Sequence, residues 1–265
     1  CPDQPAEVAR LAREHPHPLL GEPEVRRALT LGIDRRAILD NVLRSEGRIP
    51  PSPILGPLPE HDPKLETWPY DPDRARRLLA EAGFADDDGD GTLERGGEPF
   101  ELTVMHHAGN RVRRDAAIMI QQDLSRLGVR LELEPVEGAA FYSRLSSRRH
   151  DAWIARWRVS ARVDMTEMLH ARACGVQGLN FGSWSHPQAD QLASEARDEA
   201  DPEARAALWH RWERVFHEQQ PYTLLFRAHH LVGATSRLAG LETVLSNDVL
   251  NGVQTWVLEE PAGDG

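Results

Sequence analysis

Two alternating apolar patterns separated by one helical pattern restrict the possible fold more than any other feature of this sequence. Apolar residues alternate at 100–104 and again at 129–133, as in strands that bury one face. Between them, residues 110–127 carry apolar side chains at helical spacing, and Gly128 follows as a stop signal. A strand–helix–strand succession of this kind predicts a layered α/β domain.

The remaining patterns add further helices and two strands. Asp34 is a suitable N-cap for the helix that follows it, and a proline stands near the start of three others. The expected helices are 35–44, 72–82, 141–145, 187–196 and 202–217, and the expected strands are 151–159 and 222–234. Residues 47–72 contain so many prolines that we expect a long ordered loop or a linker. The sequence therefore predicts one α/β lobe with a mixed β-sheet flanked by helices.

The charge balance excludes one class of partner. The 265 residues include 31 Lys and Arg against 42 Asp and Glu, which gives a net charge of −11. A chain this acidic is poorly suited to bind phosphates over a broad face, so we expect no nucleic-acid partner. Its length allows a sizeable core without help from a metal or a disulfide, and no apolar run approaches the length of a membrane span.

Two cysteines leave several alternatives open. Cys1 and Cys174 lie too far apart for a zinc motif, and they are compatible with one disulfide or with two free thiols. Cys1 is equally a candidate for a lipid-modified N-terminus or a cut point. His170 close to Cys174 suggests a thiol nucleophile, but such a pair is more often structural. Since GxSxG, Walker and GxGxxG motifs are absent from the sequence, we predict a protein that is not an enzyme and has no cofactor.

An acidic turn is the one weak candidate for a metal site. Asp86, Asp88 and Asp90 match the first half of a calcium-binding loop, but Gly97 stands where the bidentate Glu belongs. A solvated turn is the simpler interpretation. The adjacent pair His106 and His107 falls on an expected strand, where neighbours point to opposite faces and rarely chelate one ion.

Several segments in a fixed order carry a resemblance to a known family. They are Val25–Arg35, Tyr70–Phe84, Asp88–Phe100, Asn180–Asp190 and Asp201–Tyr222. In this order they resemble the family 5 extracellular solute-binding proteins of ABC importers, which bind peptides, nickel chelates and related solutes. The resemblance implies a periplasmic-binding-protein-like lobe and a small-molecule or peptide solute. It also implies an ABC permease in the membrane as partner and a periplasmic or cell-surface location, with a lipid anchor in the full-length form.

The resemblance also divides the chain. It implies an irregular N-terminal segment at 1–22, a solute-binding lobe at 23–236, and a tail at 237–265 that would return to a missing N-terminal lobe. Two alternatives remain: a ligand-sensing regulatory module, and a protein that binds nickel or calcium.

The ligand-binding residues are assigned by the same resemblance. In peptide-binding members an Arg lies three residues before a cleft Trp, here Trp157, and an Asp lies three residues after it. This sequence has Ile154 and Ser160 there, so the charged anchors for peptide termini are replaced, and the nearest acid is Asp164. The predicted ligand-binding residues are Trp157, Arg158, Ser160, Arg162, Asp164, Asn180 and Phe181. An acidic ligand group is favoured by three arginines in this segment, Arg156, Arg158 and Arg162.

Overall fold

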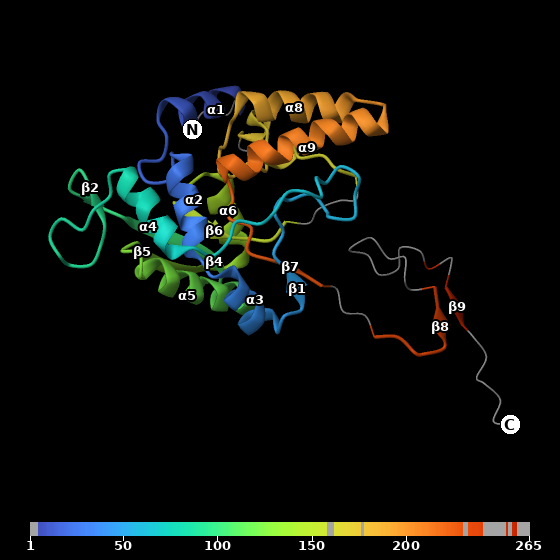
Figure 1. The fold of residues 1–265 in the computed structure, drawn as a ribbon, viewed down its shortest axis with the longest axis horizontal. Coiled ribbons are helices and arrows are strands. Elements are labelled where there is room, and N and C mark those ends of the chain that lie inside the picture. Colours follow the sequence, from blue (N-terminus) through green and yellow to red (C-terminus); the bar gives the residue numbers. More distant parts are fainter. Residues whose placement is uncertain are drawn as a thin grey trace.

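The computed structural model has an α/β architecture (Figure 1). It describes residues 5–157, 162–175, 178–229, 233–240, 253 and 256–258. The elements are α1 (Pro5–Glu14), α2 (Pro23–Gly32), α3 (Arg35–Leu43), β1 (Gly47–Arg48), α4 (Pro72–Glu81), β2 (Glu94–Arg95), β3 (Glu98–Pro99), β4 (Glu101–His107), α5 (Arg111–Ser125), β5 (Arg130–Val136), α6 (Gly138–Ser146), β6 (Ala152–Ile154), α7 (Thr166–Leu169), η1 (Ala171–Ala173), α8 (Pro187–Asp198), α9 (Pro202–Gln219), β7 (Arg227–Ala228), β8 (Leu238–Ala239) and β9 (Val257–Leu258).

A three-stranded sheet in the order β5–β4–β6 forms the centre. Both neighbours run parallel to β4, with Met105 opposite Trp153 in β6. The connection from β4 to β5 is α5, whose N-cap Asn110 accepts a hydrogen bond from the Arg113 backbone at 2.9 Å. Gly128 then turns the chain at a φ of +80°, a conformation that glycine adopts without strain. The predicted strand–helix–strand unit and the α/β class are confirmed.

The sequence predicted one mixed sheet. In the structure, parallel and antiparallel strand pairs occur in separate sheets. All three strands of the central sheet are parallel, whereas β1 with β7, β2 with β3 and β8 with β9 form separate antiparallel pairs. Two predicted strands are also much shorter than expected. Only Ala152–Ile154 of residues 151–159 and Arg227–Ala228 of residues 222–234 are strands among the described residues.

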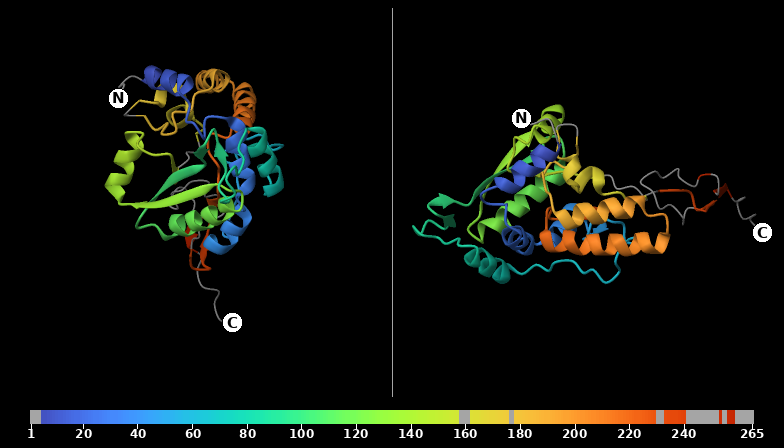
Figure 2. Two further views of the ribbon diagram at one scale, coloured as in Figure 1. Left: turned by 90° about the vertical axis from the view of Figure 1, so that its left-hand side faces the viewer. Right: turned by 90° about the horizontal axis from the view of Figure 1, so that it is seen from above.

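Helices cover both faces of the sheet (Figure 2). Side chains alternate across β4, so Leu102 and Val104 enter a cluster with α2, α4 and α5. Met105 points to the opposite side and packs with Phe141 and Leu145 of α6. The central strand is therefore buried on both faces, as is usual for parallel sheets.

α8 and α9 lie side by side and form a second layer (Figure 1). Trp209 and Trp212 of α9 are fully buried in the cluster that these helices share with α7. The Asp201 side chain caps α9 by accepting from the Ala204 backbone at 3.1 Å.

The proline-rich segment 47–72 is an ordered loop and not a linker. Ile54 is buried in the same cluster as α8 and α9. The fully buried Glu213 carboxylate of α9 accepts hydrogen bonds from the Asp62 backbone at 2.6 Å, from His61 Nδ1 at 2.8 Å and from the Ser52 hydroxyl. One buried acid therefore holds three points of the loop against α9.

The N-terminal segment 1–22 is not irregular throughout, because residues 5–14 form α1. Arg10 forms ion pairs with Glu7 and Glu14, one turn away on either side, and such pairs support a helix that is weak by pattern alone. In the predicted tail 237–265, Leu238–Ala239 pairs with Val257–Leu258. Most of the tail, like Cys1, lies outside the described residues.

Candidate functional site

A cavity of about 1660 Å³ opens where three segments of the lobe meet. One wall is β6 with the residues that follow it, from Trp153 to Trp157. The second wall is the beginning of the proline-rich loop around Pro53, and the third is the segment from Gln220 to His229. Apolar residues of β4, β5 and α5 line its inner part. A concave site with apolar walls and a few charged groups is suited to binding a small solute.

Trp157 is the predicted ligand residue that lines this cavity. Its ring stacks on Phe181 with 5.5 Å between centroids and 18° between planes, and the Arg148 guanidinium lies 5.5 Å from the Phe181 centroid. Phe181 is buried, whereas Trp157 is half-buried. Phe181 therefore supports the tryptophan from behind, and Trp157 is the ring available for stacking.

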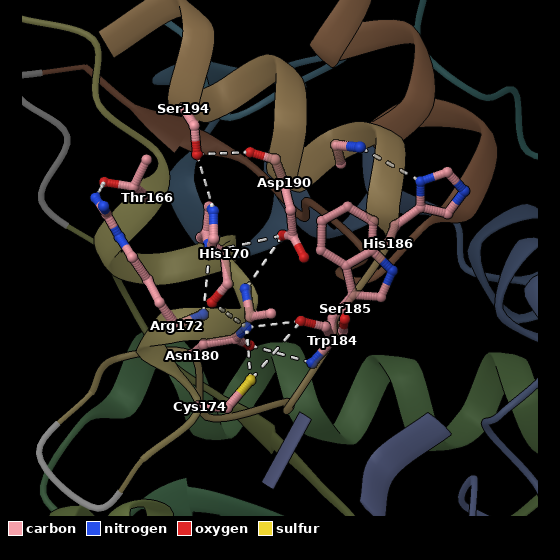
Figure 3. A network of polar contacts seen from close by, with 12 residues as sticks. Thr166, His170, Arg172, Cys174, Asn180, Trp184, Ser185, His186, Asp190 and Ser194 are labelled. Carbon is pink, nitrogen blue, oxygen red and sulfur yellow. Dashed lines mark hydrogen bonds and ion pairs between the residues drawn. The ribbon is translucent and has the colours of Figure 1, made fainter. Parts of the chain in front are cut away.

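Asn180 was predicted to touch the ligand, but its side chain is fully buried. Its amide nitrogen donates to the carbonyl oxygens of Trp184 at 2.7 Å and His170 at 3.2 Å and lies 3.3 Å from Cys174 Sγ (Figure 3). Its amide oxygen accepts from the Trp184 backbone at 3.2 Å. These contacts use the hydrogen-bonding capacity of the amide, so Asn180 fixes the loop that carries Phe181 and has no free group for a solute.

Ser194, His170 and Asp190 have the residue types of a hydrolytic triad (Figure 3). His170 Nε2 lies 3.1 Å from the Ser194 hydroxyl, but its Nδ1 accepts a hydrogen bond from the Arg172 backbone at 3.0 Å. The proton of the neutral ring must therefore be on Nε2, which makes the ring a donor toward Ser194. Burial lowers the pKa of His170 and keeps it neutral. A base that would activate the serine needs the opposite tautomer.

The suggested Cys174 nucleophile has no support from the geometry either. Cys174 is a buried free thiol, and burial raises its pKa to about 12. Its Sγ lies beside the Asn180 amide, while the His170 ring is bonded to Ser194 and the Arg172 backbone. A thiol that stays protonated is inert as a nucleophile.

Two other predicted ligand residues, Asp164 and Arg162, do not line the cavity. Asp164 accepts from the Thr166 backbone at 2.9 Å and from its hydroxyl at 2.5 Å, so it fixes the start of α7. Arg162 is exposed and is not among the lining residues, and Arg158 and Ser160 lie outside the described residues. Of the arginines that suggested an acidic ligand, Arg156 does line the cavity.

The acidic turn brings together a different set of residues from the predicted one. Carboxylate oxygens of Asp86, Asp88 and Glu94 lie within 4.8 Å of one another, whereas Asp90 accepts from the Thr92 backbone at 2.7 Å and is not in the group. Asp86 accepts from two backbone N–H groups of its own turn, at 2.8 and 3.1 Å. The β2–β3 hairpin brings Glu94, a residue of β2, to this position. The exposed carboxylates thus stabilise the turn itself.

Apart from Arg156, sequence reasoning missed the basic residues that line the cavity. The lining includes Arg48, Arg113, Arg227 and His229, and Asp151 is the acidic residue that lines it. Arg48 was hidden in the proline-rich loop. Arg227 interrupts the apolar run at 222–226, a charged residue in an otherwise apolar strand pattern, and this was the available signal.

Comparison with known proteins identifies the family. The sequence model of the bacterial extracellular solute-binding proteins, family 5 Middle, matches residues 3–177. The chain belongs to this family. Family 5 relatives include the oligopeptide-binding protein AppA of Bacillus subtilis, 29% identical over 91% of this chain, and di/tripeptide-binding protein 2 of Pseudomonas aeruginosa, 31% identical over 82%. The chain spans less than half of these proteins, 45% and 39% of their lengths.

Solved structures agree with this family 5 assignment. B. subtilis AppA in complex with a nonapeptide superposes with a TM-score of 0.81 at 27% identity, over 92% of this chain and 49% of that one. NikZ of Campylobacter jejuni in complex with Ni(L-His) superposes with a TM-score of 0.74 over 91% of this chain and 49% of that one, but its 20% identity shows a shared fold alone. The predicted resemblance is confirmed. These relatives are solute-binding proteins, which fits the prediction of a protein that is not an enzyme.

Proposed function

We propose that this chain forms one lobe of an extracytoplasmic solute-binding protein and binds a peptide-like solute for delivery to an ABC permease. The observation that carries the proposal is the cavity beside Trp157 in a chain of this family. The names of its relatives, oligopeptide-binding and di/tripeptide-binding proteins, support a peptide-like solute.

The length of the relatives supports a clamshell arrangement. Because the chain matches about half of AppA, we propose that a second lobe supplies the opposite wall and closes on the solute. A single wall buries part of the solute, so this chain alone should bind weakly. Among the described residues, no helix combines the length and the apolar character needed to cross a bilayer. An extracytoplasmic location belongs to the proposal and is supported by the family.

Calorimetric titration of the chain with trialanine tests this function. We expect weak but saturable binding that Trp157→Ala lowers about tenfold or more, since an aromatic anchor in a binding site contributes about 2 kcal/mol or more. Tyr142→Ala is the matched control, because Tyr142 is 54% exposed on α6 and is not among the residues that line the cavity. The proposal fails if neither trialanine nor other short peptides bind, or if both variants bind equally well.

A further inference from the structure

Two arginines face each other across the small antiparallel pair of β1 and β7. The register places Arg48 directly opposite Arg227. Like charges at such positions destabilise a sheet pair. Two positions along in the same register, Glu46 lies opposite His229, whose Nδ1 is 3.5 Å from the Glu46 carboxylate. The arginine pair is therefore a local departure from favourable cross-strand pairing.

Both guanidinium groups lie against the same stretch of the proline-rich loop. Arg227 Nη2 donates to the Pro53 carbonyl at 3.0 Å. Both terminal nitrogens of Arg48 lie within 3.2 Å of the position that a Cβ on Gly56 would occupy, so a side chain there would displace them. Sites three residues apart on one loop thus hold the two positive groups close to each other.

Arg227 has an unused hydrogen-bond donor. Its Nη1 is buried and has no hydrogen-bond partner among the described residues. Burial, followed by the charge of Arg48, lowers the pKa of Arg227 to about 10, so the group is still charged at neutral pH. A buried charged donor without a partner is costly, and an anion is the partner that would satisfy it.

The rest of the cavity is also positive, although the chain carries a net charge of −11. Arg113 and Arg156 line it together with the pair, against Asp151. Arg26 lines it too, but its guanidinium is occupied by backbone carbonyls of Leu20, Gly21, Gln219 and Gln220. Positive charge is concentrated inside the cavity, where it would attract an anionic group.

We propose that Arg48 and Arg227 together bind a carboxylate of the solute inside this cavity. The proposal rests on the proposed function and narrows the solute class to peptides or related molecules with an accessible carboxylate. Two guanidinium forks on one carboxylate form several charge-assisted hydrogen bonds and relieve the repulsion within the pair. The same chemistry fits an Asp or Glu of the proposed second lobe, and the experiment distinguishes the two sources.

The first arm compares trialanine with its C-terminal amide in calorimetric titrations. Wild-type protein should bind the free carboxylate about tenfold or more tightly than the amide, because amidation removes one partner of the charge pair. Arg48→Gln and Arg227→Gln should each remove this preference. Arg77→Gln, at an exposed arginine of α4 outside the lining residues, should keep it. If both pair variants keep the preference, the assignment is wrong.

The second arm does not depend on peptide binding. The melting temperature is measured in sodium acetate and in sodium chloride at equal ionic strength. Acetate should stabilise the wild type relative to chloride, and the R48Q/R227Q double variant should lose this difference. A wild type without acetate-specific stabilisation overturns the pair as an anion site. Acetate stabilisation with no peptide binding overturns the proposed function instead. Acetate stabilisation without a preference for trialanine over its amide assigns the pair to a protein carboxylate and overturns the solute assignment.

A third measurement separates binding from a structural role. Arg48→Gln removes one of two repelling charges and none of the hydrogen bonds of Arg227. Its melting temperature in chloride should therefore equal or exceed that of the wild type. A clear loss of stability in this variant would show that Arg48 supports the fold, which contradicts the proposal.

Discussion

Replacement of Asn180 by alanine should destabilise the lobe strongly, although the substitution changes a small polar residue in a loop. The side chain is fully buried and bonds both the N–H and the carbonyl of Trp184, and the carbonyl otherwise accepts only from the Cys174 thiol at 3.9 Å. The His170 carbonyl keeps a second donor, the Ala173 backbone, so its loss is smaller. Two partly buried backbone groups that lose their amide partner, at about 1–3 kcal/mol each, predict a loss of about 2–6 kcal/mol.

The assay is differential scanning calorimetry supported by urea denaturation. For a domain of this size, 1 kcal/mol lowers the melting temperature by about 2–4 °C, so Asn180→Ala should lower it by roughly 4–24 °C. Asn41→Ala is the matched control, because Asn41 is exposed on α3 and donates only to the Ala37 carbonyl of its own helix at 2.8 Å. It should have little effect. If the two variants differ by less than about 2 °C, the account of Asn180 as a positioning residue is wrong.

An isosteric substitution sharpens this test. Asn180→Asp keeps the acceptor for the Trp184 N–H but turns a second oxygen toward the Trp184 carbonyl. The ionised form should be as destabilising as alanine, and protonation restores a donor. The deficit of this variant relative to the wild type should therefore shrink as the pH falls, as followed by urea midpoints. A pH-independent deficit would contradict the assigned hydrogen bonds.

Three further predictions concern buried groups. Glu213→Ala should lower the free energy of unfolding by about 3–5 kcal/mol in urea titrations, because it leaves the Asp62 N–H and His61 without their acceptor. A loss below about 1 kcal/mol would refute the role of Glu213 in holding the loop. Cys174, whose pKa burial raises to about 12, should resist iodoacetamide at pH 8 in the native state and react in urea, as read by mass spectrometry; rapid native labelling would contradict its burial. Burial lowers the pKa of His150 to about 4 in the folded protein. The unfolded chain therefore binds this proton at higher pH, and stability should fall as the pH drops from about 6.5 toward 4. His150→Phe should flatten this fall in stability, and an unchanged pH profile would contradict the prediction.

The candidate site was only partly predictable from the sequence. Trp157, which lines the cavity, was predicted as a ligand residue because the family resemblance marks its position. The burial of Asn180 and Phe181 was not predicted, since a sequence pattern does not tell whether a side chain is buried or exposed. Arg48 and Arg227 were missed because they are 179 positions apart in the sequence, and only the fold brings them close together.

Local chemistry in the sequence by itself determined the elements and their order. Asp34 caps its helix as predicted, because an N-cap acts within three residues of itself. The structure shows the same local cap at Asp71, Asn110 and Asp201. Alternation predicted β4 and β5, since side chains of a strand point to opposite faces. Motif order identified the family.

Only the tertiary structure decided which residues share a cavity and how much of each strand pattern became a strand. Residues 222–234 have apolar strand character, but a strand needs a hydrogen-bonded neighbour, and β1 pairs only with Arg227–Ala228. In the same way Glu213 anchors a loop about 150 residues away in the chain, and the arginine pair arises from the β1–β7 register. These contacts depend on chain packing, for which a local pattern contains no information.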